Sequence, residues 1–129
     1  MRVILDSHTL IWAADDQSKL TMKALGVIQN PLNDRLISAA TIWEISIKVG
    51  KGRLPLSLPY RRWIEKAIAD LCLTILPIEI HHAERQTILP FHHRDPFDRL
   101  LAAQSLAENL PLVSGDAVFD AYGVARVWD

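Results

Sequence analysis

The sequence lacks several features that mark particular classes of protein. Its only cysteine, Cys72, cannot form an internal disulfide or a Cys/His metal cage. The 14 basic and 15 acidic residues give a formal net charge of −1, so no global excess of charge indicates a nucleic-acid or membrane partner. No apolar stretch approaches the roughly 18 residues of a membrane span, and the apolar run Val3-Ile4-Leu5 is too short for a secretory signal. We therefore expect a cytoplasmic protein with no membrane association.

The composition favours one domain with a substantial core. The chain has 129 residues, of which half are hydrophobic, so residues 1–129 are expected to form a single domain. No repeat, low-complexity segment or linker interrupts it. Short apolar runs rich in β-branched residues alternate with segments of helical periodicity. This alternation predicts an α/β fold, in which a central parallel sheet of about five short strands is flanked by helices.

The expected elements can be given by residue range. The predicted strands are 2–5, 36–37, 73–78, 111–113 and 124–128. The predicted helices are 9–14, 18–29, 41–49, 63–71, 80–89, 96–109 and 117–122. The helix over 63–71 is expected from an apolar stripe at helical spacing, which is typical of a core face. Ser18 is expected to cap the second helix.

Four acidic residues lie where a strand-like run gives way to a helix-like run: Asp6, Glu44, Asp98 and Asp116. The carboxyl ends of parallel strands meet at one edge of a sheet, and ligands bind in the crevice outside them. Four carboxylates gathered there repel one another unless a cation holds them. A hard, oxygen-rich site suits Mg²⁺ or Mn²⁺. The sequence therefore predicts a metal site at this edge.

Each acid also has a purely structural explanation. Thr41 and Glu44 are spaced as a capping box. The run Asp95-Pro96-Phe97-Asp98 is typical of a helix start, with a cap, a first-turn proline and an acid near the positive end of the dipole. Asp6 and Asp116 can each cap the short helix that follows. Glu44 shares the one polar stripe of its helix with Lys48, so it either pairs with Lys48 in solvent or faces a polar cleft.

Four segments of the chain resemble the PIN-domain family, in the family's order. They are Leu5-Asp6-Ser7-His8, Ser38-Ala39-Ala40-Thr41-Ile42-Trp43-Glu44-Ile45, His92-His93-Arg94-Asp95-Pro96-Phe97-Asp98-Arg99-Leu100-Leu101-Ala102 and Leu112-Val113-Ser114-Gly115-Asp116. The most similar branch is that of the VapC-like toxins of bacterial toxin–antitoxin pairs, and the likeness spans essentially the whole chain.

The resemblance implies a metal-dependent endoribonuclease. Asp6, Glu44, Asp98 and Asp116 fall on the family's four acidic positions, where they would hold Mg²⁺ or Mn²⁺. Direct metal contact is expected from Asp6 and Asp98, contact or orientation of the attacking water from Glu44, and support from Asp116. Cations in such a site bind the scissile phosphate and activate water. Ser7 and Ser114 fall on hydroxyl positions of the family, and Asp95 is expected mainly as a cap with a supporting role.

The resemblance also implies partners. A VapC-like protein forms a homodimer, and a small VapB-like antitoxin inhibits it, often with a basic side chain in the acidic cleft. The alternative is a catalytically silent PIN-like module that binds RNA or protein. Such a module has no physical reason to keep four mutually repelling carboxylates, so the acids favour the enzyme.

Positive charge is concentrated in one segment. Six basic residues lie within 19 positions that contain Glu65 as the only acid: Lys48, Lys51, Arg53, Arg61, Arg62 and Lys66. This segment either contacts RNA phosphates or is an ordinary solvated surface, and it could equally meet an acidic partner. Arg99 could pair with Asp98 or contact substrate. The five histidines lack the spacing of a zinc site and are left out of the metal set.

Overall fold

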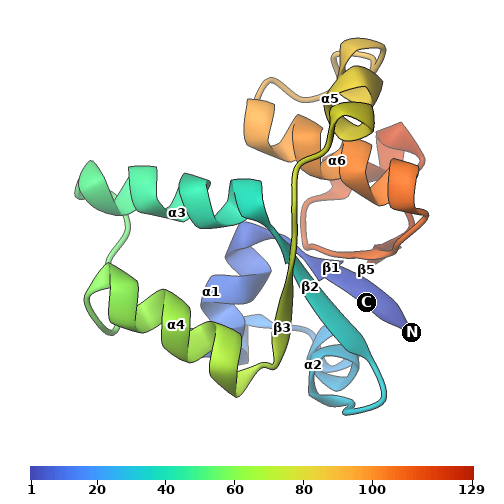
Figure 1. The fold of residues 1–129 in the computed structure, drawn as a ribbon. Coiled ribbons are helices and arrows are strands. Elements are labelled where there is room, and N and C mark those ends of the chain that lie inside the picture. Colours follow the sequence, from blue (N-terminus) through green and yellow to red (C-terminus); the bar gives the residue numbers. More distant parts are fainter.

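A computed structural model describes residues 1–129 and contains one parallel sheet of five strands (Figure 1). The strands are β1 (Arg2–Leu5), β2 (Asp34–Ser38), β3 (Leu73–Leu76), β4 (Leu112–Val113) and β5 (Arg126–Val127), in the spatial order β3-β2-β1-β4-β5. Leu5 of the central strand pairs with Ile37 on one side and with Val113 on the other. The direction of strand addition therefore reverses between β1 and β4, where the crevice of such sheets lies. The predicted parallel α/β sheet is confirmed.

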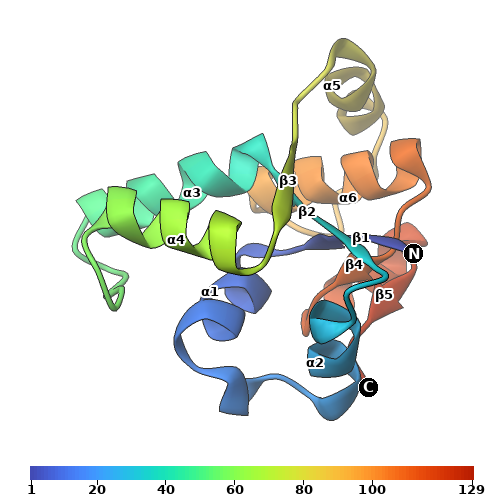
Figure 2. The same ribbon diagram turned by 60° about the horizontal axis from the view of Figure 1, so that its bottom comes forward.

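Helical segments connect the strands and cover the sheet. They are α1 (Ser7–Asp15), η1 (Gln17–Lys19), α2 (Met22–Gln29), α3 (Ala39–Gly50), α4 (Tyr60–Asp70), α5 (Ile80–Thr87), α6 (Pro96–Glu108) and η2 (Ala117–Tyr122). The alternating side chains of the strands divide the core between two faces. Val3 and Leu5 pack into a cluster with α1, α2 and α4, whereas Ile4 packs into a second cluster with α6 and η2. Figure 2 shows α1 and α2 on one side of the sheet and α6 on the other. No helix has the length and apolar character needed to cross a membrane.

Four predicted helix starts are wrong. Helices α1 and α4 begin earlier than predicted, at Ser7 and Tyr60, and other hydroxyls cap α2 and α3. The segment predicted as one helix over 18–29 is divided: Asp16 caps the short η1, and Thr21 Oγ1 accepts the Ala24 amide hydrogen at the start of α2. Likewise α3 begins directly after β2, where Ser38 Oγ accepts from the Ala40 amide at 3.1 Å. Glu44 is therefore beyond the first turn of α3, and the predicted capping box with Thr41 does not form.

Strand β4 and the residues after it tie the two sides of the crevice together. The Asp6 amide donates to the Val113 carbonyl at 3.3 Å, and Thr9 Oγ1 donates to the same carbonyl at 2.9 Å. Beyond Ser114, a Cβ added to Gly115 would lie 3.0 Å from the Trp128 ring, so any larger residue would have to push this ring aside. These contacts fix the ends of β1 and β4, from which Asp6 and Asp116 project.

Candidate metal centre

Asp6 begins the site at the carboxyl end of the central strand. Its side chain is 5% exposed, and Oδ1 accepts the Thr9 amide hydrogen at 2.8 Å as the N-cap of α1. The cap engages one carboxylate oxygen and fixes the position of the other. Capping and metal binding are therefore compatible at this residue.

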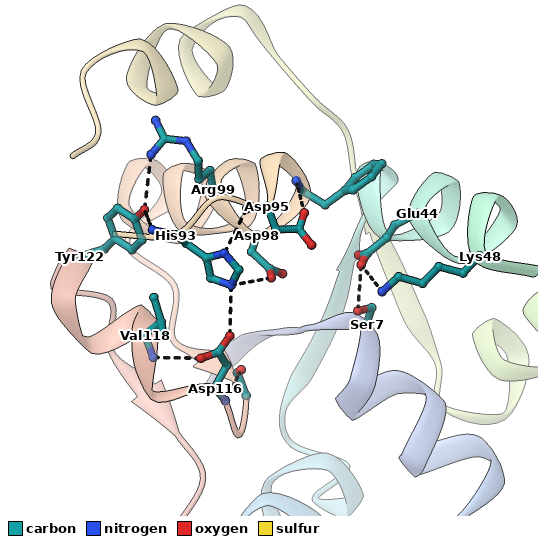
Figure 3. A network of polar contacts seen from close by, with 12 residues as sticks. Ser7, Glu44, Lys48, His93, Asp95, Asp98, Arg99, Asp116, Val118 and Tyr122 are labelled. Atoms are coloured by element: carbon teal, nitrogen blue, oxygen red, sulfur yellow. Dashed lines mark hydrogen bonds and ion pairs between the residues drawn. The ribbon is translucent and has the colours of Figure 1, made fainter. Parts of the chain in front are cut away.

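Glu44 reaches the same region from α3. It is 4% exposed, and its Oε2 accepts hydrogen bonds from Lys48 Nζ at 2.7 Å and from Ser7 Oγ at 3.4 Å (Figure 3). The pair with Lys48 has the i,i+4 spacing expected from the sequence, but it is not a solvated strip, since the carboxylate is buried. Ser7 follows Asp6 directly, so the contact joins α3 to the end of β1.

His93 bridges the other two acids. Its Nε2 lies 3.0 Å from Asp98 Oδ2 and 3.3 Å from Asp116 Oδ2, and the ligand atoms of the three residues all lie within 4.8 Å of one another (Figure 3). Its Nδ1 accepts the Asp95 amide hydrogen at 3.1 Å. The neutral ring therefore carries its proton on Nε2 and donates it to the carboxylates. Sequence reasoning missed His93, because its contact with Asp116 joins positions 23 residues apart and no local pattern signals it.

The electrostatics of Asp98 show how crowded the acids are. The pKa of Asp98 is raised to about 7, chiefly by burial and in addition by the carboxylates of Asp95, Glu44 and Asp6, while His93 lowers it. A carboxylate that is hard to ionise because other carboxylates surround it gains from a divalent cation, which relieves the repulsion. The donor set consists of carboxylate oxygens, which suits Mg²⁺ or Mn²⁺. The residues present thus fit the metal that the family implies.

The remaining acids are also held by backbone amides. Asp116 Oδ1 accepts from the Val118 amide at 3.0 Å, and the Asp116 amide donates to Ser114 Oγ at 3.0 Å. Asp95 Oδ1 accepts from the Phe97 amide at 2.8 Å as the N-cap of α6. The predicted caps at Asp6, Asp95 and Asp116 are confirmed. At Asp116 one oxygen serves the backbone and the other faces His93, so the cap orients the acid toward the site.

Arg99 does not pair with Asp98. Its side chain is buried, and its guanidinium donates to the carbonyls of Pro90 at 2.8 Å and Leu89 at 3.3 Å, with the Phe91 ring 4.0 Å from its central carbon. The expectation that Arg99 pairs with that carboxylate or contacts substrate is therefore corrected. The guanidinium is occupied by the carbonyls of the α5–α6 connection.

The basic segment divides between two places. Next to Glu44 lies a cleft of about 640 Å³, lined by four cationic side chains: Lys48, Lys51, Arg53 and Arg94. Arg61 pairs instead with Glu65, and Lys66 pairs with Asp70 on α4. Lys66 lines a separate cavity of about 660 Å³, which none of the four acids lines. Arg62 lies exposed on the same helix and lines neither of these two hollows.

The family of the chain follows from the comparison with known proteins. The model of the PIN domain matches residues 3–125, so the chain belongs to the PIN-domain family. Within that family it is VapC-like: Ribonuclease VapC22 of Mycobacterium tuberculosis is 30% identical over 116 residues, which cover 88% of this chain and 86% of that protein.

Solved structures share the fold. VapBC2 from Rickettsia felis, bound to a DNA fragment from its promoter, gives a TM-score of 0.74 at 20% identity over all of both chains. FitAcB from Neisseria gonorrhoeae gives a TM-score of 0.65 at 18% identity, over 96% of this chain and 95% of that one. At these identities the likeness concerns the fold, and it matches the parallel sheet with flanking helices described above.

Proposed function

We propose that the protein is a metal-dependent endoribonuclease and the toxin of a toxin–antitoxin pair. The observation that carries this proposal is the half-buried Asp98 carboxylate, 3.0 Å from His93 beside Asp116, whose pKa three other carboxylates raise. A site of this kind is costly without a cation. The relation to Ribonuclease VapC22 supports RNA as the substrate.

Asp6, Glu44, Asp98 and Asp116 would hold Mg²⁺ or Mn²⁺, which when bound supplies charge neutralisation at the phosphate and a water of lowered pKa. To bind this cation, Asp98 and Asp116 must give up their contacts with His93 Nε2. Ser7 Oγ and Lys48 Nζ both donate to Glu44 Oε2, which leaves Oε1 as the oxygen able to orient a water.

The cationic cleft is suited to position the RNA backbone. Lys48, Lys51 and Arg53 line it together with Glu44, so phosphates bound there lie beside the acidic cluster. Contacts of Lys and Arg with phosphate position a nucleic acid without reading its sequence. We therefore assign substrate positioning to these three residues and to Arg94, and not to Arg61, Arg62 or Lys66.

We further propose that a VapB-like antitoxin inhibits the protein, that the active form is a homodimer and that it acts in the cytoplasm. The structural relatives include VapBC proteins by name, among them VapBC-1 from nontypeable Haemophilus influenzae. The site already accepts a cationic side chain, since Lys48 Nζ lies 2.7 Å from Glu44. A basic residue of an antitoxin can occupy the acidic cluster in the same manner.

The proposal is tested with the purified protein, freed of any bound partner, on total RNA. We expect cleavage with Mn²⁺ or Mg²⁺, and none after addition of a chelator or in the Asp98→Asn variant. Circular dichroism of the variant must match that of the wild type, so that the loss is chemical and not structural. A folded wild-type protein that cuts no RNA with either metal would support the silent binding module instead.

A further inference from the structure

Two aromatic side chains accompany the acids of the metal centre. Trp43 directly precedes Glu44 on α3, and Phe97 directly precedes Asp98 on α6. Their ring centroids lie 5.5 Å apart with the planes at 76°, an edge-to-face arrangement. The two helices that bring the acids together therefore also build an aromatic pair beside them.

The aromatic pair is not part of the core. Trp43 is 62% exposed, although the residues beside it in sequence, Ile42 and Glu44, are half-buried and buried. Neither Trp43 nor Phe97 belongs to the two apolar clusters or to the side chains packed against them. Leaving most of an indole in water forgoes the large stabilisation that its burial gives. Folding alone thus offers no reason for a tryptophan here.

The charges around the pair indicate what covers it. Phe97 lines the cleft of about 640 Å³ together with Lys48, Lys51 and Arg53. Cations beside aromatic rings are the combination that binds single-stranded nucleic acid, in which phosphates follow the cations and bases stack on the rings. The acids Glu44 and Asp98, which would hold the metal that binds the scissile phosphate, are adjacent in sequence to the two rings. A base stacked on the rings would therefore belong to a nucleotide at the cleavage site.

We propose that Trp43 and Phe97 form a stacking site for an unpaired nucleobase next to the scissile phosphate. The proposal rests on the ribonuclease function proposed above and adds a preference: single-stranded RNA, whose bases are free to stack on protein, binds there better than duplex RNA. Stacking tolerates every base, so this site recognises the absence of pairing and not a sequence.

The test measures binding separately from cleavage. A single-stranded RNA oligonucleotide is titrated into wild-type protein and the Trp43→Leu variant in the presence of chelator, followed by fluorescence anisotropy of a dye on the RNA and by tryptophan fluorescence. We expect Trp43→Leu to weaken binding about tenfold and to abolish the quenching of tryptophan emission. Ile80→Ala is the matched control, since Ile80 is 88% exposed but lies on α5, and it should bind as wild type.

A fully abasic oligonucleotide of the same length makes the test specific for stacking. Since nothing fixes the register of the strand, every position is made abasic: wild-type binding of the fully abasic strand should fall about tenfold, while Trp43→Leu is indifferent to the change. Equal affinities of wild type and Trp43→Leu, equal abasic penalties in both, or no binding of single-stranded RNA by the wild type would each overturn the proposal. So would a fall of Trp43→Leu from dimer to monomer in analytical ultracentrifugation, which would assign Trp43 to contact with a second copy.

Cleavage of total RNA distinguishes this failure from failure of the ribonuclease function. A wild type that cuts RNA with Mn²⁺, and a Trp43→Leu variant that cuts it with the same KM, would remove the stacking site and leave the nuclease. A wild type that cuts nothing would remove the nuclease itself. With both proposals correct, Trp43→Leu raises KM about tenfold, whereas Ile80→Ala does not change it.

Discussion

Two histidines of this protein are held in the same way but in different electrostatic surroundings. His82 Nδ1 accepts the Glu79 amide hydrogen at 3.0 Å, and its Nε2 lies 2.7 Å from Glu108 Oε1. His93 Nδ1 likewise accepts a backbone amide hydrogen, and its Nε2 faces Asp98 at 3.0 Å. In both rings the amide fixes the proton on Nε2, which the carboxylate then accepts.

The carboxylates differ in the direction of their pKa shifts. Hydrogen bonds from His82 and His81 lower the pKa of Glu108 against the opposing effect of burial. The pKa of Asp98 is raised to about 7, because burial and three nearby carboxylates outweigh His93. Either cluster has three ligand atoms close enough for a metal ion. The distances between ligand atoms therefore do not distinguish a cluster that joins two helices from a candidate metal centre. The balance of charge around the carboxylate does.

The largest expected difference between the clusters concerns metal affinity. Asp98→Asn should weaken Mn²⁺ binding about 1000-fold, or about 4 kcal/mol, since it removes a charged ligand from the set. Glu108→Gln, the matched control, should leave it within about twofold. Isothermal titration calorimetry or the electron paramagnetic resonance signal of free Mn²⁺ measures both. Loss of Mn²⁺ binding in Glu108→Gln would show that the metal binds at the cluster of His81, His82 and Glu108 instead.

The second prediction compares the histidines in stability. His82 is 0% exposed, so His82→Ala leaves a cavity and an unpaired Glu79 amide, and we expect the free energy of unfolding to fall by about 3 kcal/mol. His93→Ala should cost about 1 kcal/mol, since His93 is only half-buried and its removal also frees the carboxylates. Urea unfolding of the metal-free proteins tests this. Equal losses of unfolding free energy in the two variants would mean that His93 contributes as much to stability as His82.

The third prediction uses pH in metal-free protein. The folded-state pKa of Asp98 lies above its unfolded value, so its ionisation destabilises the fold as pH rises from about 4 to about 7. Asp98→Asn should therefore stabilise the protein by about 2 kcal/mol above pH 7. This value allows for solvent screening, since Asp98 is partly exposed. The gain should vanish below about pH 4, where the Asp98 side chain is protonated in both states. Glu108 has a lowered pKa, so Glu108→Gln should destabilise above about pH 4.5 and be neutral well below it.

Thermal unfolding across this pH range would show two curves of opposite sign. If Asp98→Asn lowered the melting temperature at pH 8, the acids would not repel one another in the folded protein. If Glu108→Gln raised it, the tie between α5 and α6 would not stabilise the ionised carboxylate.

The positions of Asp6 and Asp116 could be predicted from the sequence, because each follows a strand closely and caps the next helical segment. Glu44 instead lies inside α3, and Asp98 lies in the first turn of α6 after a connection from α5. A parallel α/β sheet allows few strand orders. In the observed order β1 is central, which brings Asp6 to the crevice. The helix start at Ser38 was missed because a strand runs directly into α3, which leaves no loop between them. The metal-binding roles of the acids stay predictions.

Other parts of the site could not be predicted, because they depend on contacts between segments distant in sequence. His93 reaches Asp116 only when its loop folds over the end of α6, and no local pattern encodes that contact. Arg99 is drawn to carbonyls of the α5–α6 connection, although Asp98 is its neighbour in sequence. Lys66 follows α4 away from the cleft that Lys48 lines.

The smallest expected effect concerns Lys48, the cation nearest the acidic cluster. Its ammonium group competes with a metal for Glu44, but its side chain is 37% exposed, so the pair contributes only about 0.5 kcal/mol. Lys48→Met should thus bind Mn²⁺ about twofold to threefold more tightly at low salt, with the gain shrinking at high salt. The same variant should bind RNA more weakly, since it loses a phosphate contact. Tighter metal binding together with weaker RNA binding would separate the two roles of this lysine, and weaker metal binding would show that Lys48 positions Glu44 rather than competing for it.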